Sequence, residues 1–184
     1  MPPSQMTYNE LFKRIDEYFL REQALTRVRA FLEAERQVEG WFKGELLLLL
    51  KTLRKENCFA VWQSEFRTPE IGNKRIDFLV DLADGPLYLE LKAFYHGRQR
   101  DTTINLATCF TALPSDIDKL ADLRQGNKFL LIFVTPKPNP EDWKAAMKKF
   151  RKKYYFVSEA RTRDEYPNEM LIAKLHIQIS GNGG

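Results

Sequence analysis

The chain has 184 residues, 43% of them hydrophobic and 29% charged, which is typical of one globular domain and excludes a fibrous or largely disordered chain. The formal net charge is +4, a mild excess that is compatible with a polyanionic partner without requiring one. The first residues lack a signal-peptide pattern, two separated cysteines form no metal-ligand motif, and the longest apolar runs are too short to span a bilayer. We therefore expect a cytoplasmic protein.

Helical patterns occupy the N-terminal part of the chain. Thr7 to Glu10 has the form of a helix capping box, and apolar residues recur at helical spacing after it. A second helix is expected over 26–36. Gly40 is expected to interrupt the chain before a leucine-rich helix over 41–55, whose broad apolar stripe indicates burial on more than one side.

Strand patterns follow in the middle of the chain. Alternating and apolar runs predict strands over 59–66, 74–82 and 87–93. The segment Ala83–Pro86 between the last two strands carries a hairpin signal. Residues 95–105 are polar and are expected to be irregular.

Helix and strand then alternate to the end of the chain. Helices are expected over 106–113, 116–123 and 141–153, and strands over 128–135 and 170–179. This order predicts one α/β domain with a mixed central β-sheet flanked by helices. Its parts are a helical N-terminal extension, a core, and a C-terminal helix and strand, at residues 1–40, 41–135 and 136–184.

The predicted hairpin over 75–92 carries the most informative residues. Side chains alternate between the two faces of a strand. One face of the hairpin is therefore wholly apolar and suited to the core, whereas the other carries Asp77, Glu90 and Lys92.

The position of the turn predicts how these residues pair. A turn centred on the middle of Ala83–Pro86 places Asp77 opposite Lys92 and Leu79 opposite Glu90. Directly opposite residues have Cβ atoms about 5 Å apart and diagonal ones about 7–8 Å apart. The two acids and the lysine are thus expected within reach of one ion.

Two carboxylates and a lysine at this spacing suit metal-assisted hydrolysis of phosphodiesters. Mg²⁺ prefers hard oxygen ligands and is often held by one or two carboxylates, water and substrate phosphate. The metal polarises the phosphate and lowers the pKa of a bound water. A lysine can orient that water or stabilise developing negative charge. We therefore expect Mg²⁺ as the cofactor, with Mn²⁺ as an alternative.

The pattern resembles the PD-(D/E)XK nuclease superfamily, also called restriction-endonuclease-like. In that superfamily an Asp on one strand is followed by an acid-X-Lys triplet on the next strand. The matching residues here are Asp77 and the triplet Glu90–Lys92, and the resemblance covers roughly half of the chain, the length of an ordinary domain core. Ile76 departs from the family pattern, because the family often has Pro before the Asp.

The resemblance implies a restriction-endonuclease-like core with extra N-terminal helices and the activity of a Mg²⁺-dependent endonuclease. The expected substrate is DNA rather than RNA, in restriction and defence or in recombination and repair. Asp77, Glu90 and Glu45 are the implied catalytic acids, and with Leu91 they are the implied metal ligands. Glu45 matches an acid that the family tends to place on a helix before the sheet. Lys92 is implied to orient or activate the attacking water.

Other interpretations fit the same residues. An amphipathic hairpin could carry a solvent-exposed salt bridge between Asp77 and Lys92, which contributes about 0–1 kcal/mol. A catalytically silent module of the same fold could bind nucleic acid or a protein. The first two helices could also meet a partner subunit or a second copy, and a homodimer would not conflict with catalysis.

Two further acids outside the motif are also considered. Glu65, at the end of the first strand, could be a ligand or hold a water, or it could be an ordinary strand-end charge. Asp116 opens a helix, where acids interact favourably with the helix dipole. We therefore interpret Asp116 as an N-terminal cap or first-turn acid.

Basic residues outside the motif are candidate nucleic-acid contacts. Lysines on a helix face could bind a phosphate backbone in a salt-dependent manner, although such faces are often simply solvated. The candidates are His96, Arg98 and Arg100 after the hairpin and Lys148 and Lys152 on the helix over 141–153.

Overall fold

The computed structural model describes most of the chain. The described residues are 5–19, 21, 23–24, 26–27, 30, 38–95, 97–99, 102–104, 111, 113–135, 140–151, 158–161 and 173–178. The helix expected over 26–36 and the one expected over 106–113 fall largely outside these residues.

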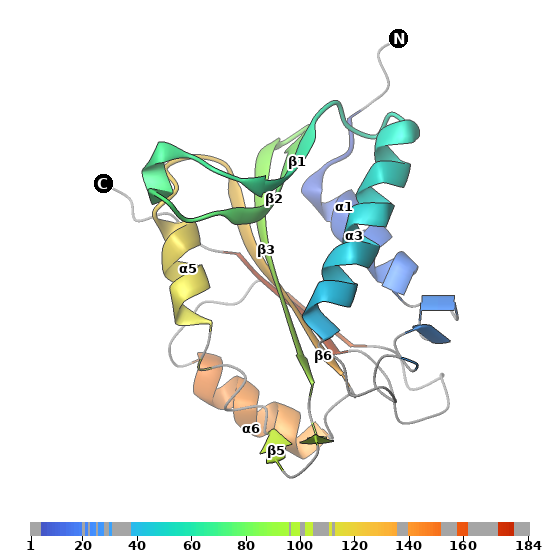
Figure 1. Ribbon diagram of the computed structural model, residues 1–184, viewed down its shortest axis with the longest axis vertical. Coiled ribbons are helices and arrows are strands. Elements are labelled where there is room, and N and C mark those ends of the chain that lie inside the picture. The colour runs from blue at the N-terminus through green and yellow to red at the C-terminus, as the bar shows by residue number, and fades with distance from the viewer. Residues whose placement is uncertain are drawn as a thin grey trace.

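The expected mixed α/β fold with helices flanking the sheet is confirmed (Figure 1). Six strands form one sheet in the order β1-β2-β3-β6-β8-β7, and all neighbouring pairs are antiparallel except β3 and β6, which are parallel. The strands are β1 (Trp62–Phe66), β2 (Ile76–Leu82), β3 (Gly85–Tyr95), β6 (Asn127–Thr135), β7 (Ser158–Arg161) and β8 (Ala173–Gln178). The helices are α1 (Tyr8–Phe19), α3 (Val38–Lys55), the short 3₁₀ helix η1 (Pro69–Ile71), α5 (Pro114–Ala121) and α6 (Pro140–Arg151).

The sheet separates two hydrophobic clusters, which we call the α3-side core and the α5-side core. Helices α1 and α3 cover one face of the sheet, and α5 and α6 cover the other (Figure 1). Strand β6 supplies both clusters, with Phe129, Leu131 and Phe133 in the α3-side core and Leu130 and Ile132 in the α5-side core. Burial on both faces explains the continuous apolar run in the sequence of β6.

Helix α1 begins with the capping box expected from the sequence. The Thr7 backbone N–H donates to the Glu10 carboxylate at 2.8 Å, and the Glu10 backbone N–H donates to the Thr7 hydroxyl at 3.3 Å. These two bonds satisfy donors that a helix N-terminus otherwise leaves unpaired.

Helix α3 starts earlier than expected, because it runs through Gly40. A glycine inside a helix costs only about 0.5–1 kcal/mol relative to alanine. Burial of Val38 and Trp41 on either side of Gly40 outweighs that cost. The helix ends where Asn57 takes a left-handed conformation with φ 60° and Cys58 N–H donates to Leu53 O, as in a Schellman motif.

The register expected for the β2–β3 hairpin is wrong by two residues. Leu82 pairs with Gly85, so the turn consists of Ala83 and Asp84, and Leu79 lies opposite Tyr88 rather than Glu90. Gly85 is the first residue after the turn. Its φ is +100°, a conformation that residues with a side chain rarely adopt, so glycine is favoured at this position. A shift of two residues keeps the side chains of the paired segments, Phe78–Leu82 and Gly85–Leu89, on their expected faces.

The same register carries Asp77 to a position opposite Glu90. The last ladder pair is Phe78 with Leu89, and continuing it by one residue on each strand brings the two acids together. Lys92 had been expected to lie directly opposite Asp77, and this expectation is wrong.

The described part of the segment over 95–105 is more regular than expected. Strands β4 (Gly97–Gln99) and β5 (Thr102–Ile104) form a separate two-stranded antiparallel ladder. Strand β7 was not expected either. No helix within the described part of the chain has the length and apolar character needed to cross a membrane.

A pair of leucines on α3 tests the placement of the α3-side core. Leu50 is 0% exposed, whereas Leu48 is 54% exposed. We expect Leu50→Ala to lower the free energy of unfolding by about 3–5 kcal/mol, because it leaves a cavity. The matched control Leu48→Ala should change it by less than about 0.5 kcal/mol. Urea denaturation followed by circular dichroism measures both values, and similar losses for the two variants would contradict this packing.

Candidate active site

The candidate site lies where the regular ladders around Asp77 are interrupted. On β1, Ser64 pairs with Phe78 and Phe66 with Ile76, while Glu65 between them has φ 53°. A left-handed conformation at a residue other than glycine costs about 1–3 kcal/mol and is often found at functional sites. Asp77 thus faces a distorted position on one side and the end of the β2–β3 ladder on the other.

The interruption also breaks the alternation of side chains along β2. Ile76 and Phe78 should share a face of a regular strand. In the structure Phe78 packs in the α3-side core and Ile76 in the α5-side core. The strand therefore turns between them, and Asp77 lies at the turning point.

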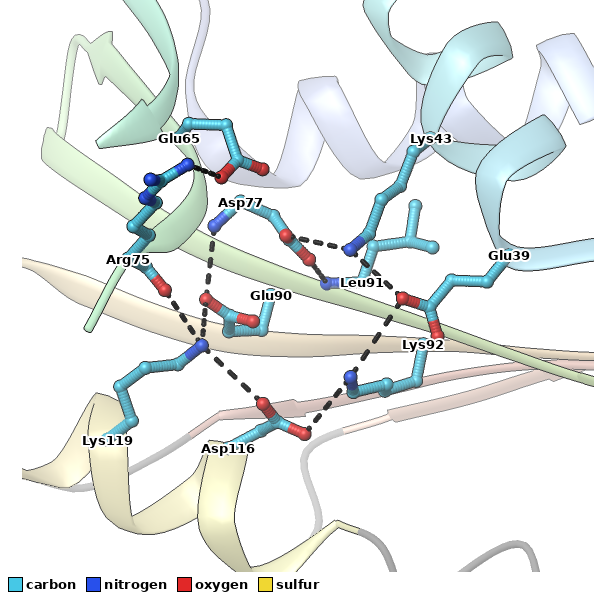
Figure 2. Close-up of polar contacts among 10 residues, drawn as sticks. All are labelled: Glu39, Lys43, Glu65, Arg75, Asp77, Glu90, Leu91, Lys92, Asp116 and Lys119. Atoms are coloured by element: carbon cyan, nitrogen blue, oxygen red, sulfur yellow. Dashed lines mark hydrogen bonds and ion pairs between the residues drawn. The ribbon is translucent and has the colours of Figure 1, made fainter. Parts of the chain in front are cut away.

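Two carboxylates replace the missing ladder partners. The backbone N–H of Asp77 donates to Glu90 Oε1 at 3.0 Å, and the backbone N–H of Leu91 donates to Asp77 Oδ2 at 2.9 Å. Both bonds are buried. We call this arrangement the crossed carboxylate pair, and it brings the two acids to one point between β2 and β3 (Figure 2).

Each acid of the crossed carboxylate pair also binds a lysine from a different helix layer. Asp77 Oδ1 lies 2.9 Å from Nζ of Lys43 on α3, and Glu90 Oε1 lies 2.7 Å from Nζ of Lys119 on α5. Burial opposes the charge on Lys43, but its hydrogen bonds to Asp77 and Glu39 outweigh burial and raise the pKa of the ammonium group. Opposite helix layers thus converge on the acids from the two faces of the sheet.

Glu90 is the most deeply buried acid of the site, with 2% of its surface exposed. Burial raises the pKa of Glu90 to about 7, and repulsion from Asp77 adds to this effect. The hydrogen bond and charge of Lys119 act in the opposite direction and lower the pKa. The protonation of Glu90 therefore depends on the charges of both neighbours.

Lys92 lies nearby in a looser environment. Its Nζ is 3.5 Å from Asp116 Oδ2 and 3.9 Å from Glu39 Oε1, both longer than the roughly 2.7–2.9 Å of a strong charged hydrogen bond. Its side chain is 24% exposed. Lys92 is thus near the acids without being tightly bound to any of them (Figure 2).

Glu45 does not join this group of residues, contrary to expectation. Its carboxylate accepts hydrogen bonds from the Tyr18 hydroxyl at 2.6 Å and from Arg27 at 2.8 Å. Burial raises the pKa of Tyr18 to about 12, and the hydrogen bond to Glu45 contributes to that rise. The α3 side chains that do reach the site belong to Glu39 and Lys43.

Helix geometry explains the error. A helix turns by about 100° per residue, so residues four apart share a face and residues two apart lie on nearly opposite sides. Glu39 and Lys43 are four apart and contact each other at 3.0 Å, whereas Glu45 follows Lys43 by two residues. Glu45 is therefore turned toward α1.

The remaining candidates have varied positions. Glu65 is exposed and pairs with Arg75 at 3.2 Å. Leu91 could offer a metal only its backbone carbonyl, since its side chain is apolar, and its N–H donates to Asp77. Lys148 is exposed on α6, and Arg98 lies in β4, where only the backbone is described. His96, Arg100 and Lys152 lie outside the described residues.

Three residues of the site were not identified from the sequence, namely Glu39, Lys43 and Lys119, and a fourth, Asp116, was interpreted only as a helix cap or first-turn acid. Asp116 is in the first turn of α5, as expected, but it is also buried and lies 3.5 Å from both Lys92 and Lys119. The available signal was their helical spacing, because Glu39 and Lys43 are four apart and Asp116 and Lys119 three apart.

The donor atoms suit a hard cation, although lysines already neutralise them. The described residues contain no group of three or more acid, histidine or cysteine side chains placed to hold a metal together. Asp77 and Glu90 nevertheless offer carboxylate oxygens, the ligands that Mg²⁺ prefers. An ionised carboxylate has about four acceptor positions, so a lysine and a metal can share one carboxylate. The residues present therefore fit a site with two protein carboxylates.

Because Asp77 and Lys119 act on the pKa of Glu90 in opposite directions, removing one or the other should shift this pKa in opposite directions. Asp77→Asn removes a repulsion and should lower the pKa of Glu90 below about 7, whereas Lys119→Met removes an attraction and should raise it. A ¹³C NMR titration of the glutamate carboxyl groups measures both shifts. The exposed Asp81 on β2 provides the control Asp81→Asn, which should leave this pKa unchanged. Shifts in the same direction for both site variants would contradict the geometry.

Comparison with known proteins yielded no relationship: no family model matches the chain, and searches of the curated proteins and of the solved structures found no match.

Proposed function

We propose that this protein is a metal-dependent nuclease that hydrolyses phosphodiester bonds in DNA, of the PD-(D/E)XK type. One observation carries the proposal: two buried carboxylates from adjacent strands meet at a break in the sheet, with a loosely held lysine two residues after the second acid. Burying two acids side by side costs free energy, so such an arrangement is more readily explained by function than by stability.

In this proposal Asp77 and Glu90 hold Mg²⁺ or Mn²⁺, and the backbone carbonyl of Leu91 is the third candidate ligand. The bound cation supplies polarisation of the phosphate and a water of lowered pKa. Lys43 loosens its contact with Asp77 to free an acceptor position. Its 28% exposed side chain can move toward solvent while remaining near Glu39.

Lys92 has the properties of the residue that contacts substrate. Its ammonium group is partly exposed, and the ion pairs it makes with described residues are long, 3.5 Å to Asp116 and 3.9 Å to Glu39. Such a group can turn toward a phosphate or an attacking water without leaving a buried acid unpaired. Asp116 and Glu39 then act as positioning residues that keep Lys92 near the acids.

A catalytically silent module that binds DNA is the second candidate. The observation that favours it is charge balance. The positive charges of Lys43, Lys92 and Lys119 neutralise most of the negative charge at the centre of the site (Figure 2) without any metal. The four acids at this centre are Glu39, Asp77, Glu90 and Asp116. Exposed lysines on α6, including Lys144 and Lys148, could bind the phosphate backbone in either candidate function.

Asp77→Asn should reduce nuclease activity by at least about a hundredfold, because loss of a metal ligand removes several kcal/mol of transition-state stabilisation. Asp81→Asn is the matched control, since it makes the same change four residues along β2 at an exposed position and should retain activity. The assay follows cleavage of plasmid, single-stranded DNA and RNA in Mg²⁺, Mn²⁺ or EDTA.

Activity that persists in EDTA, or equal activity of Asp77→Asn and wild type, would exclude the proposed metal site. Retention of DNA in a mobility-shift assay without cleavage under any of these conditions would favour the silent module.

Contacts of α6 with DNA predict a change in salt dependence. The double variant Lys144→Ala, Lys148→Ala should weaken binding to unrelated sequences equally and reduce the slope of log K against log salt by up to about 2, at roughly 0.9 per lost phosphate contact. Lys51 and Lys55 are exposed on α3, across the sheet from α6, and their double alanine variant is the control. Fluorescence anisotropy at several salt concentrations measures both slopes, and identical slopes for all proteins would contradict a role for α6.

A further inference from the structure

The amino group of Lys119 occupies an unusually complete set of oxygen contacts. Its Nζ lies 2.7 Å from Glu90 Oε1, 2.8 Å from the backbone carbonyl of Arg75 and 3.5 Å from Asp116 Oδ1. The side chain is only 12% exposed. A lysine ammonium has three N–H donors, and here three oxygens surround them.

These oxygens come from three separate elements and meet only because of the fold. Glu90 is on β3, Asp116 is on α5, and Arg75 directly precedes β2 at the break in the sheet. We call the three oxygens the ammonium seat. Figure 2 shows Lys119 reaching into it from α5.

The contacts of Lys119 differ from those of Lys43, which forms ordinary ion pairs. Lys43 contacts the side chains of Asp77 and Glu39 and is 28% exposed, so its departure uncovers no backbone group among these contacts. Departure of Lys119 would leave the buried Glu90 carboxylate without its cation and the Arg75 carbonyl without this donor. Leaving a buried carboxylate unpaired is strongly unfavourable.

We infer that the ammonium seat is a cation-binding site that Lys119 fills from within the chain, and that it is the second cation position of the active centre. The second half of this inference rests on the proposed function. Phosphodiester hydrolysis at paired acidic sites often uses two metal ions, one near each of the attacking and leaving oxygens. The tethered ammonium of Lys119 takes one of those positions, so the wild-type centre takes up a single divalent cation.

Chemical replacement of the ammonium group tests the seat itself. Lys119→Ala removes the atoms of n-propylammonium and should lower the melting temperature. Added n-propylammonium chloride should raise the melting temperature of this variant progressively with concentration, because a ligand that binds the native state stabilises it. The same salt should not do so for wild type or for Lys74→Ala, whose exposed lysine lies 3.9 Å from Asp122. Sodium chloride at equal ionic strength controls for screening.

Equal responses of all three proteins to n-propylammonium would overturn the seat, as would a Lys119→Ala protein as stable as wild type. If Lys119→Ala does not fold, Lys119→Gln provides the comparison, since its amide can still donate to Glu90 but carries no charge. Added n-propylammonium should then raise the melting temperature of the Gln variant more than that of wild type. A rise no larger than that of wild type would overturn the seat.

Counting bound Mn²⁺ tests the second cation position. Equilibrium dialysis monitored by electron paramagnetic resonance should find one Mn²⁺ per wild-type chain and two per Lys119→Ala chain. Two ions in wild type, or one in the variant, would overturn the role of Lys119 as an internal cation. If wild type binds no Mn²⁺, the proposed function fails together with the second half of the inference, while rescue by the amine still decides whether the seat exists.

Discussion

The crossed carboxylate pair is the interaction on which the rest of the site depends. Asp77 and Glu90 each accept a hydrogen bond from the backbone of the other strand, in place of the regular ladder between β2 and β3. The bonds satisfy two buried N–H groups that the end of the ladder would leave unpaired. They also hold both acids at fixed positions. The left-handed conformation of Glu65 and the change of face between Ile76 and Phe78 lie next to these acids.

Charge neutralisation explains how such a centre remains stable. A buried acid without a partner would be protonated or would unfold its surroundings. Here α3 supplies Lys43 to Asp77, and α5 supplies Lys119 to Glu90, so helices on opposite faces of the sheet stabilise one point between two strands. The same arrangement makes the acids responsive to a change in their cations.

Local patterns in the sequence predicted the elements well and their contacts less well. Alternation along β2 and β3 and the apolar run of β6 predicted the strands, and the hairpin signal placed Asp77 and Glu90 on adjacent strands without pairing them directly. The register was wrong by two residues because the expected turn was centred between Asp84 and Gly85, whereas the turn consists of Ala83 and Asp84 and the ladder resumes at Gly85. Glu45 was chosen because it matches the helix acid of the family pattern, but its direction on the helix depends on where α3 packs. Lys119 could not be identified, since its contacts to Glu90 and Arg75 exist only after α5 has packed on the sheet.

The most direct measurement is the anomalous-difference map of a crystal soaked in Mn²⁺. A peak between the carboxylates of Asp77 and Glu90, with Lys119 still bound to Glu90, is the result expected from the geometry. Crystals of Asp77→Asn should show no such peak under the same soak. A wild-type map without density between these carboxylates, or with Mn²⁺ bound only elsewhere on the chain, would contradict a metal site at the crossed carboxylate pair.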